Sequence, residues 1–267
     1  MNRIIHEITD GISGFLGFSE KINGCFSCGE SCVGVDLLCR KCSTQLIPLS
    51  GDSCVRCGRY LDWKVGTIGT VGTVGTVANG LLCPRCASVK TSFDLVISCY
   101  EYNGLCKELL HRLKYSNERE LAAVFGRKMG DTMGEVLFEN SGKLYENSIL
   151  IPVPISKDKM ETRGYNQALC LAEKVGKISG IKVVDGLLRI KDTQGQHKLT
   201  KIERNENIKG AFSFNFKYNI FNRHAILVDD IFTTGSTAEE CAKALKQAGA
   251  ARVTVLTAAG GGRKSIL

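Results

Sequence analysis

The stretch from residue 224 to residue 245, HAILVDDIFTTGSTAEECAKAL, limits the possible folds more than any other part of the sequence. An apolar run ends at two adjacent carboxylates, Asp229 and Asp230, and a short polar turn then leads into a helical pattern. An apolar run that does not alternate with polar residues is typical of a parallel strand buried on both faces. The stretch therefore predicts a strand followed directly by a helix, as in the βαβ units of a parallel sheet.

The sequence after residue 90 repeats this order of strand and helix. Strands are expected at 93–102, 148–154 and 251–259, two helices within 104–137, and one helix at 166–180. The sequence thus predicts an α/β fold, with a mostly parallel sheet and flanking helices. Ligands of such sheets bind beyond the carboxyl ends of the strands, which is where Asp229 and Asp230 are expected.

The polar turn after Asp230 is suited to a phosphate. Backbone N–H groups at the start of a helix attract an anion, and a glycine lets the backbone approach it closely. The turn supplies that glycine and four hydroxyl groups, in the residues Thr233, Thr234, Gly235, Ser236 and Thr237. We therefore predict a binding loop for a phosphate monoester at 233–237.

The two carboxylates need a different partner, because they would repel a phosphate. Vicinal ribose hydroxyls donate hydrogen bonds to carboxylates, and Mg²⁺ accepts carboxylate ligands directly or through water. A sugar phosphate would satisfy both halves of this corner. In the alternative interpretation, Asp229, Asp230 and the threonines only form a turn and a helix N-cap, which one such residue could do alone.

The cysteines are concentrated near the N-terminus, where nine of the thirteen lie before residue 90. Eight of these nine form four CxxC pairs, and two such pairs can bind one tetrahedral Zn²⁺ through four thiolates. Without a secretion signal, metal is favoured over disulfides. We predict two structural zinc sites with sequential pairing of the CxxC pairs, and a cross-braced pairing is the alternative that the spacing also allows. In the sequential grouping the ligands are Cys25, Cys28, Cys39 and Cys42, and then Cys54, Cys57, Cys83 and Cys86.

These patterns divide the chain into three parts. We expect a helix at residues 1–24, a double zinc-ribbon-like module at residues 25–90 and the α/β domain at residues 91–267. Residues 65–80 form a Gly-Thr-Val repeat, which predicts a flexible or loosely hairpinned excursion because its three-residue period gives no strand face. Through residue 90, nine Lys and Arg stand against seven Asp and Glu. This near balance favours a structural role for the module over contact with nucleic acid.

Positive charge gathers between residues 157 and 209, where twelve Lys and Arg stand against seven Asp and Glu. Such an excess attracts a polyanion. Arg163 suits a diphosphate because a guanidinium pairs with phosphate oxygens in a forked geometry, and Asn166 and Gln167 follow it at the start of a helix. Arg204 is expected on a mobile polar lid. A solvated surface charge is the alternative interpretation of each arginine.

The N-terminal stretch is not typical of a signal peptide, because it carries Glu7 and Asp10 and lacks a continuous apolar core. No apolar run approaches the roughly 20 residues that a membrane-spanning helix needs. The sequence therefore predicts a cytoplasmic protein without membrane insertion.

The corner ILVDDIFTTGST resembles the motif with which type I phosphoribosyltransferases bind 5-phosphoribosyl 1-diphosphate (PRPP). Further motifs resemble the ComF family, which joins a phosphoribosyltransferase domain to an N-terminal double zinc ribbon. They are the paired cysteines, LHRLKY at 110–115, IPVP at 151–154, RGYNQ at 163–167 and QHKLTKIERNENIKGAF at 196–212. The resemblance spans nearly the whole chain from residue 25 to about residue 257, and the Gly-Thr-Val repeat is the departure from it.

The resemblance implies roles for several residues. Asp229 and Asp230 would hold the ribose 2′- and 3′-hydroxyls, residues 233–237 the 5′-phosphate, and the loop at Val153 the pyrophosphate. Mg²⁺ would accompany PRPP. We name Asp229, Asp230 and Arg204 as candidate catalytic residues.

Two functions fit this resemblance, which also implies a role in DNA uptake and natural transformation. In the first, the protein is a Mg²⁺-dependent phosphoribosyltransferase with an unknown acceptor. In the second, it is a non-catalytic PRPP sensor or an adaptor for single-stranded DNA and the uptake machinery. Stacking aromatic residues would support DNA binding, and Tyr115 and Tyr165 are the candidates that the sequence suggests.

Overall fold

The computed structural model describes residues 24–32, 37–49, 54, 69–70, 81–138, 147–191 and 208–261. The chain forms two compact units, Met1–Thr44 and Gln45–Leu267. Apart from its last residue, the helix expected at 1–24 lies outside the described residues, as does most of the repeat at 65–80. The expected division of the chain at residue 90 stays a prediction, and the second group of paired cysteines belongs to the larger unit.

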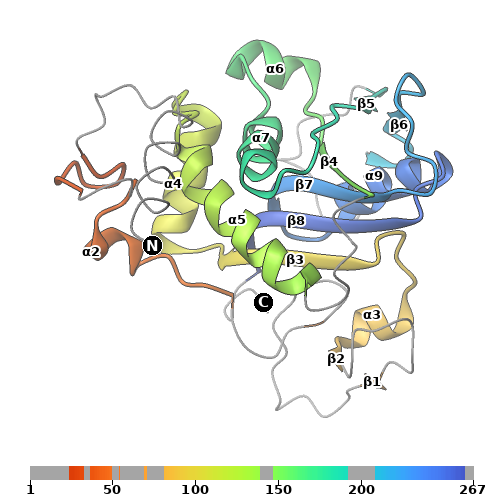
Figure 1. The fold of residues 1–267 in the computed structure, drawn as a ribbon, viewed down its shortest axis with the longest axis horizontal. Helices are drawn as coiled ribbons and strands as arrows, with labels where there is room; N and C mark the ends of the chain where they lie inside the picture. Colours follow the sequence, from red (N-terminus) through yellow and green to blue (C-terminus); the bar gives the residue numbers. More distant parts are fainter. Residues whose placement is uncertain are drawn as a thin grey trace, which may run out of the picture. The chain divides into compact units, whose positions relative to one another are not determined.

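A four-stranded parallel sheet forms the centre of the larger unit (Figure 1). Its strands lie in the order β3 (Leu95–Glu101), β8 (Arg252–Gly260), β7 (His224–Phe232) and β4 (Ser148–Pro152). Every neighbouring pair is parallel. The α/β fold expected from the sequence is therefore confirmed.

Helices cover both faces of this sheet, which explains why its strands are apolar without alternation. On one face, α5 (Leu121–Phe138) packs against β3 and β8, and α7 (Gln167–Ser179) against β4 and β7. On the other, Ala225 and Leu227 of β7 share a buried cluster with Cys241 and Leu245 of α9 (Ser236–Gln247). As neighbouring residues of a strand point to opposite faces, successive residues of β7 face different helices.

Two short segments cover the edges of the sheet. Glu101 N donates to Ile47 O and Leu49 N donates to Cys99 O, both over 2.9 Å, along β3. At the opposite edge, Leu150 N donates to Lys182 O over 2.9 Å and Val184 N to Leu150 O over 2.8 Å. The outer strands therefore present fewer unpaired backbone groups to other chains.

The remaining elements are short, apart from α4 (Gly104–Tyr115). In the larger unit, β5 (Leu187–Arg189) pairs with β6 (Phe212–Phe214) and β1 (Gly69–Thr70) with β2 (Leu81–Leu82), both antiparallel. Two residues of the repeat, Gly69 and Thr70, thus pair with the strand that follows the repeat. The helices α2 (Arg40–Ser43), α3 (Pro84–Ser88) and α6 (Lys157–Arg163) complete the described structure. None of the described helices has the length and apolarity that a membrane span requires.

A buried histidine ties three strands together near their N-terminal ends. His224 Nδ1 lies 3.3 Å from Ser148 Oγ of β4, and His224 Nε2 lies 2.9 Å from Thr254 Oγ1 of β8. Burial, followed by the charge of Arg252, lowers the pKa of His224 from 6.5 to about 4. The folded protein therefore holds this imidazole in the neutral form.

This pKa predicts a loss of stability in acid that depends on His224. Between pH 6.5 and about 4 the unfolded chain binds a proton that the folded chain refuses, so the free energy of unfolding falls as the pH decreases. Between about pH 7 and about pH 5 the wild type should lose about 2 kcal/mol more than His224→Gln, measured by urea unfolding. The exposed His111→Gln is the matched control and should behave as the wild type. Equal losses in all three proteins would contradict this explanation.

Candidate functional site

The two aspartates lie within β7, close to its carboxyl end, and α9 begins four residues after the strand. Because side chains alternate along a strand, Asp229 points to the face that α9 covers and Asp230 to the face that carries α7. The Asp229 carboxylate also accepts a hydrogen bond of 2.9 Å from the backbone N–H of Asp230. The two carboxylates are thus adjacent in sequence but have different surroundings.

Asp230 is held inside the protein by two side chains. It is only 4% exposed, its Oδ2 forms an ion pair with Lys114 of α4, and its Oδ1 accepts a 3.1 Å hydrogen bond from Gln167 Nε2 of α7. Burial alone would raise the pKa of Asp230, but the charge and hydrogen bond of Lys114 outweigh it and lower the pKa. Asp230 is therefore an ionised carboxylate with a cationic partner.

Asp229 has the opposite electrostatic character. Burial and then the negative charge of Asp230 raise its pKa well above the ordinary value. One ionised and one readily protonated carboxyl group carry less negative charge than two aspartates in water. The corner therefore repels a phosphate less than the sequence alone suggests.

The turn between β7 and α9 has the backbone shape that a phosphate loop requires. Gly235 adopts φ +78° as the N-cap of α9, and an added Cβ would lie 2.8 Å from Cζ of Phe232. Only glycine fits both constraints well. Thr234 Oγ1 and Ser236 Oγ lie 2.8 Å apart, while the Thr233 side chain is exposed. The N–H groups of the first turn of α9 thus open toward a site lined by hydroxyls.

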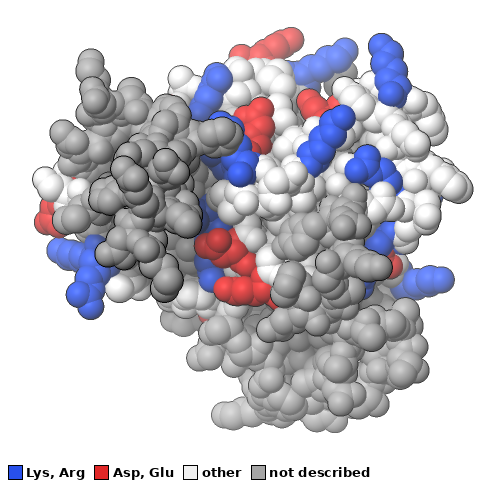
Figure 2. All heavy atoms as spheres, in the orientation of Figure 1, with Lys and Arg blue, Asp and Glu red and all other residues white. Residues whose placement is uncertain are grey.

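Four cations, here called the cation cluster, lie close enough to influence one another: Lys114, Lys159, Arg163 and Arg189. One of them, Lys114, pairs with Asp230. Burial and then the positive charges of the other three lower the pKa of Lys159. The Arg163 guanidinium donates to Gln167 and lies 5.2 Å from the Tyr115 ring centroid. In Figure 2, basic side chains lie in the upper part of the view, with acidic side chains between them. The crowding of like charges in the cation cluster favours binding of a polyanion.

Two expected ligand-binding residues form bonds within the protein. The Asn166 side chain accepts from Ala168 N and donates to Val153 O, both over 3.0 Å. Asn166 therefore caps α7 and fixes the loop after β4. Val153 has a buried side chain, and its backbone N–H donates to Val228 O over 2.9 Å. Both residues are placed to shape the loop, and their direct contact with a ligand stays a prediction.

The structure adds three residues that the sequence analysis did not single out as site residues, namely Lys114, Lys159 and Arg189. Lys114 lies inside the family-like motif LHRLKY, so the motif was a usable signal for it. Lys159 and Arg189 were counted only as part of a regional charge. Arg204, expected on the lid, lies outside the described residues.

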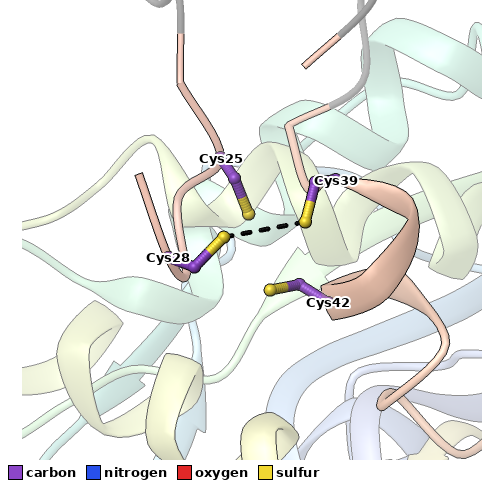
Figure 3. Close-up of side chains that lie close together, drawn as sticks. All are labelled: Cys25, Cys28, Cys39 and Cys42. Atoms are coloured by element: carbon purple, nitrogen blue, oxygen red, sulfur yellow. Dashed lines mark hydrogen bonds between the residues drawn. The ribbon is translucent and has the colours of Figure 1, made fainter. Parts of the chain in front are cut away.

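The first cysteine group has the geometry of a four-thiolate metal site. The Sγ atoms of Cys25, Cys28, Cys39 and Cys42 all lie within 4.8 Å of one another, and Figure 3 shows them pointing toward a common centre. Cys28 Sγ and Cys39 Sγ are 3.6 Å apart, close to the roughly 3.8 Å edge of a tetrahedron with Zn–S bonds of about 2.3 Å. Ser27 N also donates to Cys25 Sγ over 3.4 Å.

The second cysteine group is formed by Cys54, Cys83 and Cys86, all buried and also within 4.8 Å of one another. Cys57, the expected fourth ligand, lies outside the described residues. Both groups follow the sequential pairing. Burial raises the pKa of Cys99 and Cys106 to about 12, so these thiols stay protonated, as expected for ordinary core residues.

Metal analysis tests the two cysteine groups. We expect about two zinc ions per chain, because each group offers the soft tetrahedral donors that zinc prefers. Cys39→Ser should lower the zinc content by about one ion, whereas Cys32→Ser, a neighbouring cysteine outside both groups, should leave it unchanged. A wild-type zinc content near zero would contradict the assignment, as would an equal loss in both variants.

Three known proteins are similar to this chain over most of its length. Competence protein F of Haemophilus influenzae is 30% identical over 175 residues, which make up 65% of this chain and 76% of that protein. Competence protein ComFC of Bacillus subtilis is 27% identical over 215 residues, or 80% of each chain. DNA utilization protein YhgH of Salmonella typhimurium is 29% identical over 220 residues, which cover 82% of this chain and 94% of that protein.

Comparison with solved structures gives weaker likenesses, and no protein-family model matches the chain. A glutamine PRPP amidotransferase from B. subtilis is 18% identical with a TM-score of 0.29, covering 48% of this chain and 25% of that one. Scores at this level carry no weight in the assignment. The sequence relationship to competence protein F does support an assignment, because the two chains are 30% identical and the match covers 76% of that protein. The chain therefore belongs to the competence protein F (ComF) family.

Proposed function

We propose that this protein binds PRPP, or a closely related sugar diphosphate, at the corner between β7 and α9. The observation that carries the proposal is the buried ion pair of Asp230 with Lys114, a member of the cation cluster, close to the turn that leads into α9. A monophosphate, a vicinal diol and a diphosphate in one ligand would match the three kinds of groups that meet there.

Each part of such a ligand would have its own partner. The phosphate monoester fits the N–H groups and hydroxyls of 233–237, since a helix N-terminus stabilises an anion. The ribose hydroxyls fit the carboxylates of Asp229 and Asp230. The diphosphate fits the cation cluster, in which Arg163 offers a forked donor.

Turnover would rely on positioning and electrostatics. As a diphosphate leaves the ribose, negative charge builds up on its oxygens, and the cation cluster would stabilise that charge. The described part of the site offers no dedicated general base, so the acceptor would have to be a good nucleophile or bring its own base. Asp229 and Asp230 would hold Mg²⁺ together with the ligand's oxygens, and this ion when bound would neutralise further phosphate charge.

A role in DNA uptake is the second part of the proposal. Its support is the sequence relationship to proteins named for competence and for DNA utilization. Whether the bound sugar phosphate is consumed or sensed decides between an enzyme and a regulator. A pyrophosphate-release assay with PRPP, Mg²⁺ and candidate acceptors, with and without single-stranded DNA, separates these two possibilities.

Removal of the two carboxylates tests the ligand site. Asp229→Asn combined with Asp230→Asn should abolish the Mg²⁺-dependent rise in melting temperature that PRPP gives the wild type, because binding to the native state stabilises it. The exposed Asp131→Asn on α5 is the matched control and should keep the full rise. If the double variant shows an unchanged rise, the corner is not the ligand site.

Binding of single-stranded DNA is a second candidate function, favoured by an aromatic surface. In the segment 215–223, Phe216 is 81% exposed, Phe221 75% and Tyr218 42%. Lys217 and Arg223 lie in the same segment, and no acidic residue occurs between residues 208 and 228. Exposed aromatic rings with neighbouring cations suit unstacked bases and their phosphates.

The aromatic segment also improves on the candidates that the sequence suggested. Tyr165 is buried, and the Arg163 guanidinium lies over the Tyr115 ring. The end of the segment directly precedes β7, so Arg223 lies about 20 Å along that strand from Asp229. DNA stacked on Phe221, at this end of the segment, would therefore not occupy the sugar-phosphate corner.

The aromatic surface can be removed without touching the core. Phe216→Ala combined with Phe221→Ala should raise the dissociation constant for single-stranded DNA by about tenfold or more, since each base–aromatic stack contributes about 1–3 kcal/mol. Stabilisation by PRPP should not change, and Ile178→Ala, another exposed apolar residue, serves as the control. Unchanged DNA affinity, or binding that is insensitive to salt, would refute this assignment.

A further inference from the structure

The last turn of α4 contacts the candidate site at three points. The Leu113 carbonyl accepts a hydrogen bond from the Tyr165 hydroxyl, which fixes the turn between α6 and α7. The Tyr115 ring lies under the Arg163 guanidinium at 5.2 Å. Between them, Lys114 forms its ion pair with Asp230. Three successive residues of α4 therefore hold a tyrosine, an arginine and a carboxylate of the site in place.

Lys114 occupies the carboxylate of Asp230, which is expected to bind the ribose hydroxyls. Gln167 occupies Oδ1 of Asp230 and Lys114 occupies Oδ2, and the carboxylate is only 4% exposed. Each carboxylate oxygen can accept about two hydrogen bonds, so one donor on each would still leave room for a ribose hydroxyl. Oδ2 is also buried, however, and it contacts the Lys114 ammonium, so a ribose hydroxyl has no open approach to it. Binding of a sugar at Asp230 thus requires Lys114 to move.

We propose that Lys114 exchanges partners on binding: it neutralises Asp230 in the empty site and turns to the diphosphate of the ligand, which frees Asp230 for the ribose. This inference rests on the proposed sugar-diphosphate function and makes Lys114 a residue that binds the diphosphate. One side chain would then couple recognition of the diphosphate to recognition of the sugar.

The structure gives Lys114 the properties that such an exchange needs. Its side chain is 20% exposed, so Lys114 is not fully enclosed by the core. A lysine side chain has a flexible four-carbon stem that ends in a compact charge, so a small rotation of the stem moves the ammonium between neighbouring anions. The other members of the cation cluster already lie close enough to lower the pKa of Lys159. A diphosphate among them would replace Asp230 as the anionic partner.

A purely structural ion pair is the competing explanation. Buried ion pairs often add little stability, although removal of one partner alone is costly. A structural pair predicts that loss of Lys114 disturbs the whole site and weakens every ligand alike. The exchange predicts a selective effect, because the diphosphate loses a partner while the ribose gains an accessible carboxylate.

The experiment compares three ligands on two variants of the full-length protein. Dissociation constants for PRPP, inorganic pyrophosphate and ribose 5-phosphate are measured by calorimetry with Mg²⁺ present. In Lys114→Met, those for PRPP and pyrophosphate should rise by about tenfold or more, the usual effect of losing a charged hydrogen bond. That for ribose 5-phosphate should stay equal or fall. Lys107→Met, an exposed lysine of the same helix, should match the wild type.

A second variant guards against misfolding. Lys114→Gln keeps a hydrogen-bond donor near Asp230 but no charge, so it should fold and show the same selective loss of diphosphate affinity. Equal weakening of all three ligands, or no weakening of any, would overturn the exchange while leaving the sugar-phosphate site intact. A wild-type protein that binds none of the three would overturn the proposed function and the exchange together.

Discussion

The parallel arrangement of β4, β7 and β8 is the constraint on which the rest of the site depends. Parallel strands bring their carboxyl ends to one edge of the sheet, so the loop after β4 and the turn after β7 meet there. Helices on both faces keep water from the strands, and the strand alternation then gives Asp229 and Asp230 different surroundings. The chemistry of the corner is thus a consequence of how the sheet is built.

The positive charges at this edge of the sheet outnumber the negative charges when no ligand is bound. Lys114 lowers the pKa of Asp230, and Asp230 in turn raises that of Asp229. Lys159, Arg163 and Arg189 add positive charge near Lys114, and this crowding lowers the pKa of Lys159. A bound diphosphate would relieve that crowding, whereas a neutral sugar would not.

Sequence patterns predicted the parallel sheet, the corner of β7 and α9, and the cysteine groups, because strand periodicity, turn residues and CxxC spacing are local signals. The role of Lys114 was not predicted from the sequence because its partner, Asp230, lies far along the chain. Asn166 and Val153 were assigned to a ligand, whereas the hydrogen bond that joins them appears only in three dimensions. Local patterns do not report such long-range pairs. Phe216 and Phe221 were missed because phenylalanines are usually buried, and only the folded chain shows which of them stay exposed.

A crystal structure of the protein with PRPP and Mg²⁺ would show whether the corner between β7 and α9 binds a sugar diphosphate. We expect the 5′-phosphate at the N-terminus of α9, against residues 233–237, and the diphosphate against Arg163 and Lys114, with the ion pair between Lys114 and Asp230 opened. A ligand bound elsewhere, or a corner that stays empty at saturating PRPP with the ion pair closed, would contradict this expectation.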